Sequence, residues 1–230
     1  MPATEVVSIE AARGRARALL QVPAPVDGDS GPRPLAVMLH GAGGTPEQGL
    51  ALLAPFAAEA GVLVLAAASA GDTWDSVQGA PRGDAEGIEE AIARVRQHHA
   101  IDPGRLVIGG FSDGASCALG LGLARADLFC CIVALSPGFI PRTMPTGRPP
   151  VFISHGTHDT VLPISRCSRL IAPRLREIGC EVSYREFEGG HVIPPDVARQ
   201  AVAWLLRGPA DGLLGAAGQS GHADPRESAA

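Results

Sequence analysis

A strand that leads into a glycine-flanked serine and then into a small-residue helix is the feature that most restricts how this chain can fold. Residues 105–111 read as a buried strand, and Ser112 follows between Gly110 and Gly114 in a G-x-S-x-G pattern. The pattern predicts a sharp strand-to-helix turn that holds the serine in a strained backbone conformation and leaves no room for side chains at the two glycines. The serine then lies at a helix N-terminus, which favours developing negative charge. In a glycine-rich chain, a chance match in a loop is the alternative.

The remaining pattern indicates the α/β class. Short apolar runs alternate with stretches of helical period, which is typical of βαβ units and a mostly parallel sheet with helices on both faces. The predicted strands are 4–9, 15–22, 35–39, 62–67, 105–111, 130–135, 150–154 and 181–187, the first two forming an antiparallel edge. Beyond the helix after Ser112, helices are predicted from Thr45 toward residue 60, from Asp84, over 165–178 with a kink or break at Pro173, and over 194–207.

Length and composition favour one domain with a tail. The 230 residues can bury one substantial core, so we expect a catalytic domain over 1–208. After Gly208 the composition turns to small and polar residues that cannot offset ordering entropy, and we expect 209–230 to be mobile. Neither a signal peptide nor a membrane span is apparent, which predicts a cytoplasmic protein. The net charge of −5 without charge blocks favours a small-molecule partner over nucleic acid.

Missing residue types exclude several kinds of site. The sequence contains no Lys and no Asn, which excludes Schiff bases, Ser-Lys dyads, P-loop lysines and Cys-His-Asn sites. The five cysteines form an odd set without a C-x-x-C pair, which favours buried thiols in a reducing compartment; they are Cys117, Cys130, Cys131, Cys167 and Cys180. Cys117 stands out because it lies five positions after Ser112.

A second glycine-rich loop precedes the serine turn. Residues 34–44, PLAVMLHGAGG, again lead from a strand into a loop. Acyl transfer requires two backbone N–H donors aimed at the tetrahedral oxyanion, and we assign them to Ala42 and Asp113. The carboxylate of Asp113 then needs no catalytic role. A tight turn without catalytic function is the alternative for this loop.

The acid and the base are expected later in the chain. Asp159 follows the strand at 150–154, and His191 lies in a glycine loop before the last helix, so the order is Ser112, Asp159, His191. An acid in this position holds the imidazole in the correct tautomer and stabilises the imidazolium. The competing residues are His98 and His99 at a helix end, His222 in the tail, and Asp72, Asp75 and Asp84, which precede the serine. His155 and His158 could form a metal site with Asp159, but their spacing matches no zinc signature.

With these residues assembled, the chain resembles the α/β-hydrolase superfamily. It is similar to the phospholipase/carboxylesterase group, which includes acyl-protein thioesterases, and to polyhydroxybutyrate depolymerase-type esterases. The resemblance covers roughly residues 33–207 and rests on four motifs: LHGAGG at 39–44, GFSDG at 110–114, HGTHDTVLP at 155–163 and GGHVIP at 189–194. It implies the same triad of Ser112, Asp159 and His191 and the same oxyanion hole. Asp113 stands where thioesterase members usually carry Gln, which favours ester over thioester hydrolysis.

These features predict a serine carboxylic-ester hydrolase that acts on short- to medium-chain esters without a metal or organic cofactor. The alternatives are a thioesterase, a lipid or polyester hydrolase or a peptidase on the same triad, and a ligand-binding protein without turnover. The segment 136–150 is short, which predicts an open cleft with little or no lid. The expected lining residues are Gly41, Gly43, Trp74, Phe139, Val161 and Val192, with core packing as the alternative for the last four.

Overall fold

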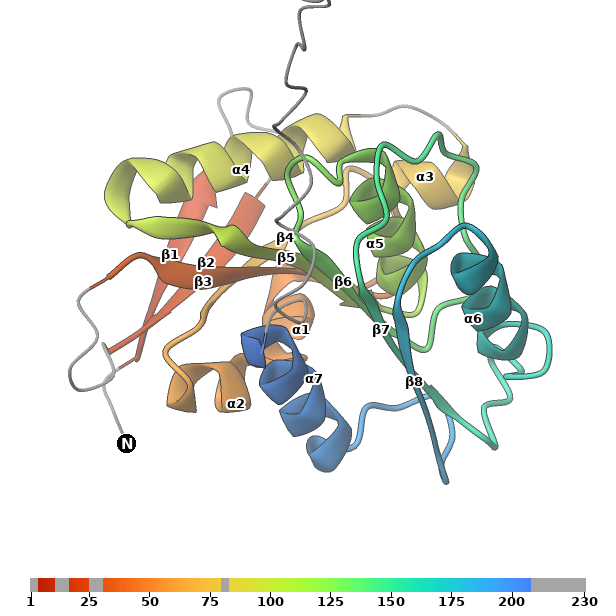
Figure 1. Ribbon diagram of the computed structural model, residues 1–230. Helices are drawn as coiled ribbons and strands as arrows, with labels where there is room; N and C mark the ends of the chain where they lie inside the picture. Colours follow the sequence, from red (N-terminus) through yellow and green to blue (C-terminus); the bar gives the residue numbers. More distant parts are fainter. Residues whose placement is uncertain (1–3, 11–16, 25–30, 80–82, 208–230) are drawn as a thin grey trace, which may run out of the picture.

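The computed structural model describes residues 4–10, 17–24, 31–79 and 83–207. Within these ranges, eight strands form one sheet in the order β1-β2-β4-β3-β5-β6-β7-β8, and seven helices pack around it (Figure 1). The strands are β1 Thr4–Glu10, β2 Arg17–Pro23, β3 Arg33–Leu39, β4 Leu63–Ala67, β5 Ile101–Phe111, β6 Cys131–Leu135, β7 Val151–Gly156 and β8 Val182–Phe187. The helices are α1 Pro46–Ala51, α2 Ala54–Glu59, α3 Asp75–Gln78, α4 Asp84–His98, α5 Asp113–Ala124, α6 Ser168–Glu177 and α7 Pro195–Arg207.

Strand pairing confirms a mostly parallel sheet with an antiparallel edge. β1 pairs with β2, and β2 with β4, in antiparallel orientation. From β4 to β8 every neighbouring pair is parallel, so these strands end at the same edge of the sheet. In open α/β sheets this carboxyl edge is where ligands bind.

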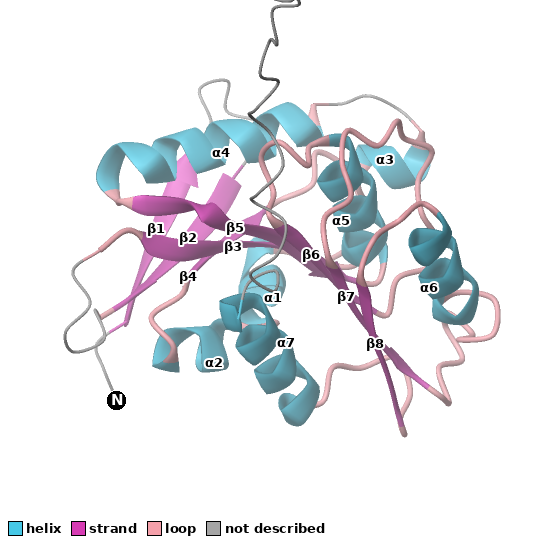
Figure 2. Ribbon diagram, viewed as in Figure 1, coloured by secondary structure: helices cyan, strands magenta, loops and turns pink. Residues whose placement is uncertain are grey.

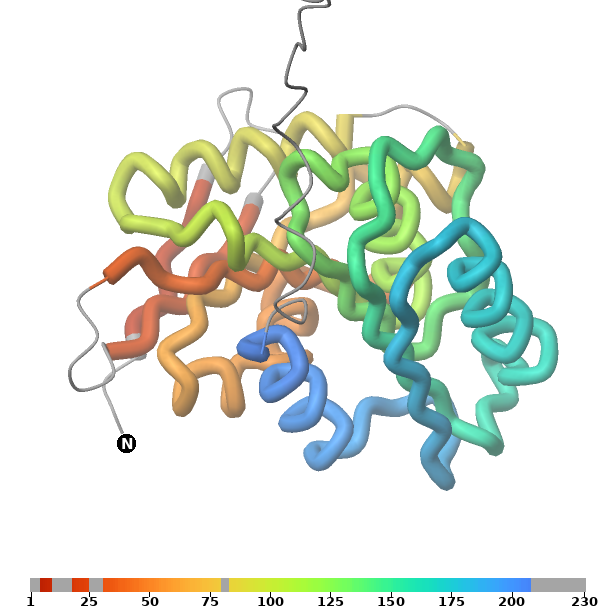
Figure 3. Tube along the Cα trace, viewed as in Figure 1, coloured from red at the N-terminus to blue at the C-terminus, as the bar shows by residue number. Residues whose placement is uncertain are grey.

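The sheet separates two apolar cores. Along β3, Leu35, Val37 and Leu39 contact the core shared with α4, α5 and α6, whereas Ala36 and Met38 contact the core shared with α1, α2 and α7. Figure 2 shows these helices on opposite faces of the sheet. In Figure 3 the blue C-terminal segment of α7 lies on the same side as the orange segments of α1 and α2, although the sequence places them far apart. Because both faces are covered, the parallel strands are continuous apolar runs.

The helix predicted from Thr45 toward residue 60 is divided in two. Thr45 caps α1 as predicted: its Oγ1 accepts a hydrogen bond from the Gln48 N–H at 3.4 Å, and Gln48 Oε1 accepts one from the Thr45 N–H at 3.1 Å. The break falls before Pro55, which has no N–H to continue the α1 ladder but suits the first turn of α2. The expectation of one helix was therefore wrong.

Two further helices differ from expectation. α6 is continuous through Pro173, so the predicted break is absent, and the missing N–H removes a single bond from the ladder. α3, a single turn at Asp75–Gln78, was not predicted. Within the described ranges, no helix is both long and apolar enough to cross a membrane. The predicted tail at 209–230 lies outside the described residues.

We predict that Gly122→Ala destabilises the fold. A methyl group on Gly122 in α5 would lie 2.4 Å from Cγ1 and 2.5 Å from Cδ1 of Ile132 in β6, too close for the helix to keep its position. Such overpacking lowers the free energy of unfolding by about 1–3 kcal/mol, measurable by urea denaturation. Gly104→Ala is the control, because its methyl group meets only Asp102 Oδ1 at 3.3 Å. Equal losses in the two variants would contradict the packing argument.

Candidate active site

Ser112 occupies a strained turn between β5 and α5. Its φ of 57° and ψ of −122° place it in a conformation that side chains rarely adopt. An added Cβ on Gly110 would lie 2.5 Å from Gly114 backbone atoms, and one on Gly114 would lie 2.2 Å from the Leu39 carbonyl oxygen and 2.4 Å from that of His40. Both contacts are with backbone, which cannot move aside. The two glycines are therefore required for this turn, as the sequence pattern predicted.

His191 and Asp159 form a hydrogen-bonded pair. His191 Nδ1 lies 2.6 Å from Asp159 Oδ2, so the imidazole donates from Nδ1 and its Nε2 is left as an acceptor. The Asp159 side chain is fully buried and that of His191 is 15% exposed. Asp159 follows β7, and His191 lies in the loop between β8 and α7, which are the positions that the sequence predicted.

The carboxylate of Asp159 is held by its own loop. Oδ1 accepts hydrogen bonds from the N–H groups of Val161 at 2.9 Å and Leu162 at 2.8 Å. Burial favours the neutral acid, but the hydrogen bonds from Leu162 and His191 outweigh it and lower the pKa of Asp159 below its usual value. Asp159 therefore carries its negative charge beside His191 throughout the neutral pH range.

Two contacts bring the loops together around the serine turn. The ring of His191 packs on Phe111, the residue before Ser112, with centroids 4.5 Å apart. An added Cβ on Gly41 would lie 3.3 Å from Ser112 Cβ, so the loop after β3 lies directly against the serine. The ends of three parallel strands and the loop after β8 thus meet at the carboxyl edge of the sheet.

The two predicted oxyanion donors are available. The Gly43 N–H donates to the Asp72 carbonyl at 2.6 Å, and the Gly44 N–H donates to the Gly41 carbonyl at 3.0 Å. In the described part of the chain, the N–H groups of Ala42 and Asp113 have no acceptor. The Asp113 N–H also belongs to the first turn of α5, at the positive end of that helix dipole.

Trp74 supports the loop after β3 from behind. Its indole Nε1–H donates to the His40 carbonyl at 2.8 Å, and the rings of Trp74 and His40 pack with centroids 4.8 Å apart. His40 Nδ1 lies 2.7 Å from the Gly41 carbonyl, and its Nε2 accepts from the Ser69 N–H at 3.2 Å. Because Trp74 is 0% exposed, it cannot line an open cleft, and this expectation is corrected. The apolar ring fills the core, while its single donor satisfies a buried carbonyl.

Thr73 is a site residue that the sequence did not reveal. Its Oγ1 donates to Asp113 Oδ2 at 2.7 Å and so connects the loop after β4 to the start of α5. The Asp113 carboxylate thereby has a structural partner, in keeping with a role for this residue through its backbone. No sequence pattern marks Thr73, because the contact joins residues forty positions apart.

The competing acids and histidines have other places. Asp84 accepts from the N–H groups of Ala70 and Asp75, each at 2.7 Å, and burial raises its pKa despite these bonds. Asp75 accepts from the Gly83 N–H at 2.8 Å, so both are loop and capping residues, as predicted.

The competing histidines differ in exposure. His98 and His158 are exposed, His99 is half-buried and His155 is fully buried; His222 lies outside the described residues. The described ranges contain no group of three or more side chains that could hold a metal.

Three of the other predicted lining residues are exposed apolar side chains. Phe139, Val161 and Val192 are 41%, 64% and 54% exposed. Val161 is two residues after Asp159, and Val192 directly follows His191. The Phe139 N–H lies 3.4 Å from Ser116 Oγ, one turn into α5 from the serine turn. Exposed apolar side chains are typical of a ligand-binding surface where they form a contiguous patch.

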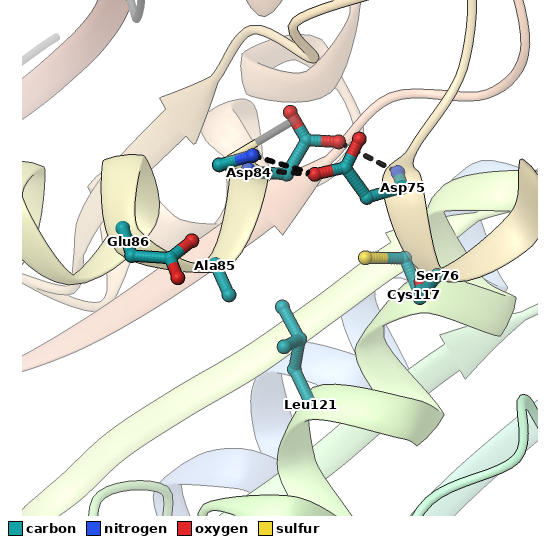
Figure 4. Close-up of a pocket in the computed structure, with 8 residues that line it drawn as sticks. Asp75, Ser76, Asp84, Ala85, Glu86, Cys117 and Leu121 are labelled. Atoms are coloured by element: carbon teal, nitrogen blue, oxygen red, sulfur yellow. Dashed lines mark hydrogen bonds between the residues drawn. The ribbon is translucent and has the colours of Figure 1, made fainter. Parts of the chain in front are cut away.

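A cavity of about 380 Å³ lies apart from these groups, between α3, α4 and α5 (Figure 4). Its lining residues are Asp75, Ser76, Gly83, Asp84, Ala85, Glu86, Cys117 and Leu121. Burial raises the pKa of the Cys117 thiol to about 12, so it stays protonated and unreactive near neutral pH. All five cysteines are free thiols, and four of them are buried.

Comparison with known proteins agrees with the geometry. The profile of the phospholipase/carboxylesterase family matches residues 82–205, just over half of the chain. Acyl-protein thioesterase 1 of Emericella nidulans is 28% identical over 100 residues, which are 40% of this chain and 41% of that protein. Acyl-protein thioesterase 1 of Gibberella zeae is 31% identical over 117 residues, 46% of this chain and 49% of that protein. The chain therefore spans less than half the length of these relatives.

A solved structure extends the likeness to most of the fold. S-formylglutathione hydrolase from Staphylococcus aureus superposes with a TM-score of 0.72 at 14% identity, covering 89% of this chain and 97% of that one. At this identity the likeness shows the fold alone. Together with the parallel sheet and its two helical layers, it confirms the α/β-hydrolase fold.

We predict that Trp74→Phe is more destabilising than Trp204→Phe. The first change leaves the buried His40 carbonyl without its 2.8 Å partner and opens a void, which lowers the free energy of unfolding by at least about 2 kcal/mol. Trp204 is half-buried, and its indole bonds only to Ser183 Oγ at 2.9 Å, where water can replace it. Urea denaturation followed by far-ultraviolet circular dichroism compares the two. Similar losses would show that the His40 contact is not important.

Proposed function

Because the chain belongs to the phospholipase/carboxylesterase family of hydrolases, we propose that it cleaves carboxylic esters through an acyl-enzyme on Ser112. It is an esterase- or thioesterase-type hydrolase at the level of the family. The observation that carries the proposal is the strained turn at Ser112 beside the 2.6 Å contact between His191 and Asp159. Packing of the core does not require a strained serine at this turn. Nucleophilic catalysis does require a serine held beside an ordered acid–base pair.

In the first half of the reaction, Ser112 Oγ attacks the ester carbonyl carbon while His191 Nε2 takes the serine proton. The resulting tetrahedral intermediate collapses, the bond to the alcohol oxygen breaks, and His191 returns the proton to the leaving alcohol. In the second half, water attacks the acyl-enzyme by the same route and releases the carboxylic acid and free Ser112. Asp159 stays ionised and stabilises the imidazolium in both halves.

The oxyanion is assigned to the N–H groups of Ala42 and Asp113. Support comes from the Gly43 N–H, which is already used by the Asp72 carbonyl, whereas the Ala42 N–H has no acceptor in the described ranges. The contact between Trp74 and His40 fixes the loop before substrate arrives. Donors that need no rearrangement during the reaction are the most effective stabilisers of developing charge.

We further propose short- to medium-chain acyl groups and a single catalytic domain over 1–208. We assign the exposed side chains of Phe139, Val161 and Val192 to the acyl-binding surface, with Phe139 contributed by the short segment 136–150. Gly41 and Gly43 allow close approach of the substrate along the loop after β3. Thioester hydrolysis is the second candidate, because the curated relatives are acyl-protein thioesterases. Asp113 in place of the usual Gln favours the ester.

We predict that Ser112→Ala abolishes hydrolysis of p-nitrophenyl esters. Loss of the nucleophile lowers kcat by several powers of ten and leaves only the effect of binding and the oxyanion donors. Turnover of esters from acetate to palmitate, beside an acyl-coenzyme A series, measures both chain length and ester-to-thioester preference. A fluorophosphonate probe should label the native protein and not the variant. A fully active Ser112→Ala variant would overturn the proposal, and an optimum at palmitate would overturn its chain-length part.

We predict that Ala42→Pro lowers kcat about 10²–10³-fold while KM changes little, because proline removes one oxyanion donor. In the described ranges only Ser112 and Ser136 are non-glycine residues with positive φ, so the φ of Ala42 has the negative sign that proline requires. Gly41 before it also avoids the clash of a side chain with the proline ring. Ala42→Ser keeps the N–H and serves as the control. If both variants retain native kcat, the donor is another group.

A further inference from the structure

His155 is a buried polar residue that the proposed mechanism does not use. It lies near the end of β7, is 0% exposed, and both of its ring nitrogens have partners. Nδ1 lies 2.6 Å from Ser168 Oγ at the start of α6, and Nε2 lies 2.8 Å from the Leu162 carbonyl oxygen. Nε2 is also 3.3 Å from Asp159 Oδ2. A buried imidazole with this many partners has its orientation fixed by its surroundings.

The partners also determine which ring nitrogen carries the proton. A carbonyl oxygen can only accept a hydrogen bond, so Nε2 must be the donor toward Leu162. In the neutral ring, Nδ1 is then the acceptor, and the Ser168 hydroxyl must donate to it. Burial lowers the pKa of His155, the contacts to Leu162 and Asp159 offset this only in part, and the ring stays neutral near pH 7.

Leu162 connects this ring to the acid. Its N–H donates to Asp159 Oδ1 at 2.8 Å, while its carbonyl accepts from His155 at 2.8 Å. The peptide groups on both sides of Leu162 are thereby fixed between the carboxylate and the sheet. His155 Nε2 also lies 3.3 Å from Oδ2, the oxygen that contacts His191, so its polarised N–H is close to the negative charge on that oxygen.

We propose that His155 is a positioning residue for Asp159, and that the Ser168 hydroxyl supports the tautomer that the Leu162 carbonyl imposes on His155. The inference rests on the proposed function, because it concerns the acid of the proposed triad. A neutral ring supplies a hydrogen-bond donor without a second positive charge. Asp159 can then give its full negative charge to one imidazolium, that of His191, in the transition state.

The charged and titratable groups around His155 are consistent with this role. Asp159 and His191 face it from the two loops, and Glu186 lies opposite it in register on β8. Glu186 is held by Arg169, whose Nη2 lies 2.7 Å from Oε2, and by Tyr184, whose hydroxyl donates to Oε1 at 2.8 Å. Cys167, next to Ser168, is buried, and burial raises its pKa, so it adds no charge.

The first test compares kcat and KM of four variants on p-nitrophenyl butyrate. His155→Leu removes both hydrogen bonds and should lower kcat on the order of 10²-fold, the effect of a misplaced catalytic group, with KM within about threefold. His155→Gln places an amide N–H near the depth of Nε2 and should restore most of kcat. Ser168→Ala should lower kcat by a smaller factor, because Nδ1 loses its hydrogen-bond donor while the Leu162 carbonyl still fixes the tautomer. Ile92→Ala on α4 is the control that destabilises the core away from the site.

A second readout tests whether the buried His155 ring is neutral. Histidine in an unfolded chain has a pKa near 6.5. Below that pH the unfolded chain binds a proton at His155 more readily than the folded chain does, because the pKa of His155 is lowered on folding. Because the pKa of His155 is lower in the folded chain, its neutral ring contributes fully to the free energy of unfolding above about pH 6.5. This contribution is lost as the pH falls below that value. Between pH 7 and 5, the native protein should therefore lose stability relative to His155→Gln. If the free energies of unfolding of the native protein and of His155→Gln change in parallel with pH, the inference that the His155 ring is neutral is refuted.

The outcomes also separate this inference from the proposed function. If Ser112→Ala is inactive but His155→Leu keeps native kcat, the esterase mechanism stands and the role of His155 is refuted. If Ser112→Ala is fully active, the proposed function fails, whatever His155 does. If His155→Gln is as inactive as His155→Leu, a donor at Nε2 does not explain the loss, and the positioning role is refuted. Equal losses in Ile92→Ala would refute it as well.

Discussion

The close contact between the start of α5 and the end of β3 is the constraint on which the rest of this structure depends. Gly114 approaches the Leu39 and His40 carbonyls so closely that no larger residue fits, and Gly110 faces Gly114 at similar range. This contact fixes the position of Ser112 relative to the neighbouring loop. Trp74 then holds the same loop from the other side through the His40 carbonyl. Distances that matter for chemistry are thus set by backbone packing, which varies little with thermal motion.

Few charged groups surround the site. The described residues near Ser112 offer one buried carboxylate with a lowered pKa, Asp159, and two imidazoles that face it. The first imidazole, His191, is partly exposed, while His155 is fully buried and neutral. Both rings approach the same oxygen, Oδ2, but they differ in burial and in their other partners, which for His155 are Ser168 and the Leu162 carbonyl. The N-terminus of α5 supplies the complementary positive potential without any lysine.

Much of the fold could be predicted because its determinants are local. Short apolar runs that alternate with helical stretches predict the strands to within a few residues. The capping pattern at Thr45 predicts the start of α1. The predicted order of Ser112, Asp159 and His191 places them on loops that meet at one edge. The division between α1 and α2 was missed because the apolar pattern continues across Pro55, although proline favours a new helix start there. Trp74, Thr73 and His155 depend on contacts between distant segments, for which the sequence carries no local signal.

The separation of the interior into two cores has a consequence for how activity is lost. Ser112 caps α5, which belongs to one core, whereas His191 is directly followed by α7, which belongs to the other. The sheet lies between them, so either layer of helices can loosen while the opposite layer stays packed. Detachment of α7 removes support from the His191 loop and from Phe111, which packs against the same core directly before Ser112. Heat inactivation can therefore precede global melting, and loss of turnover reports on one layer before the spectroscopic signal of the whole protein changes.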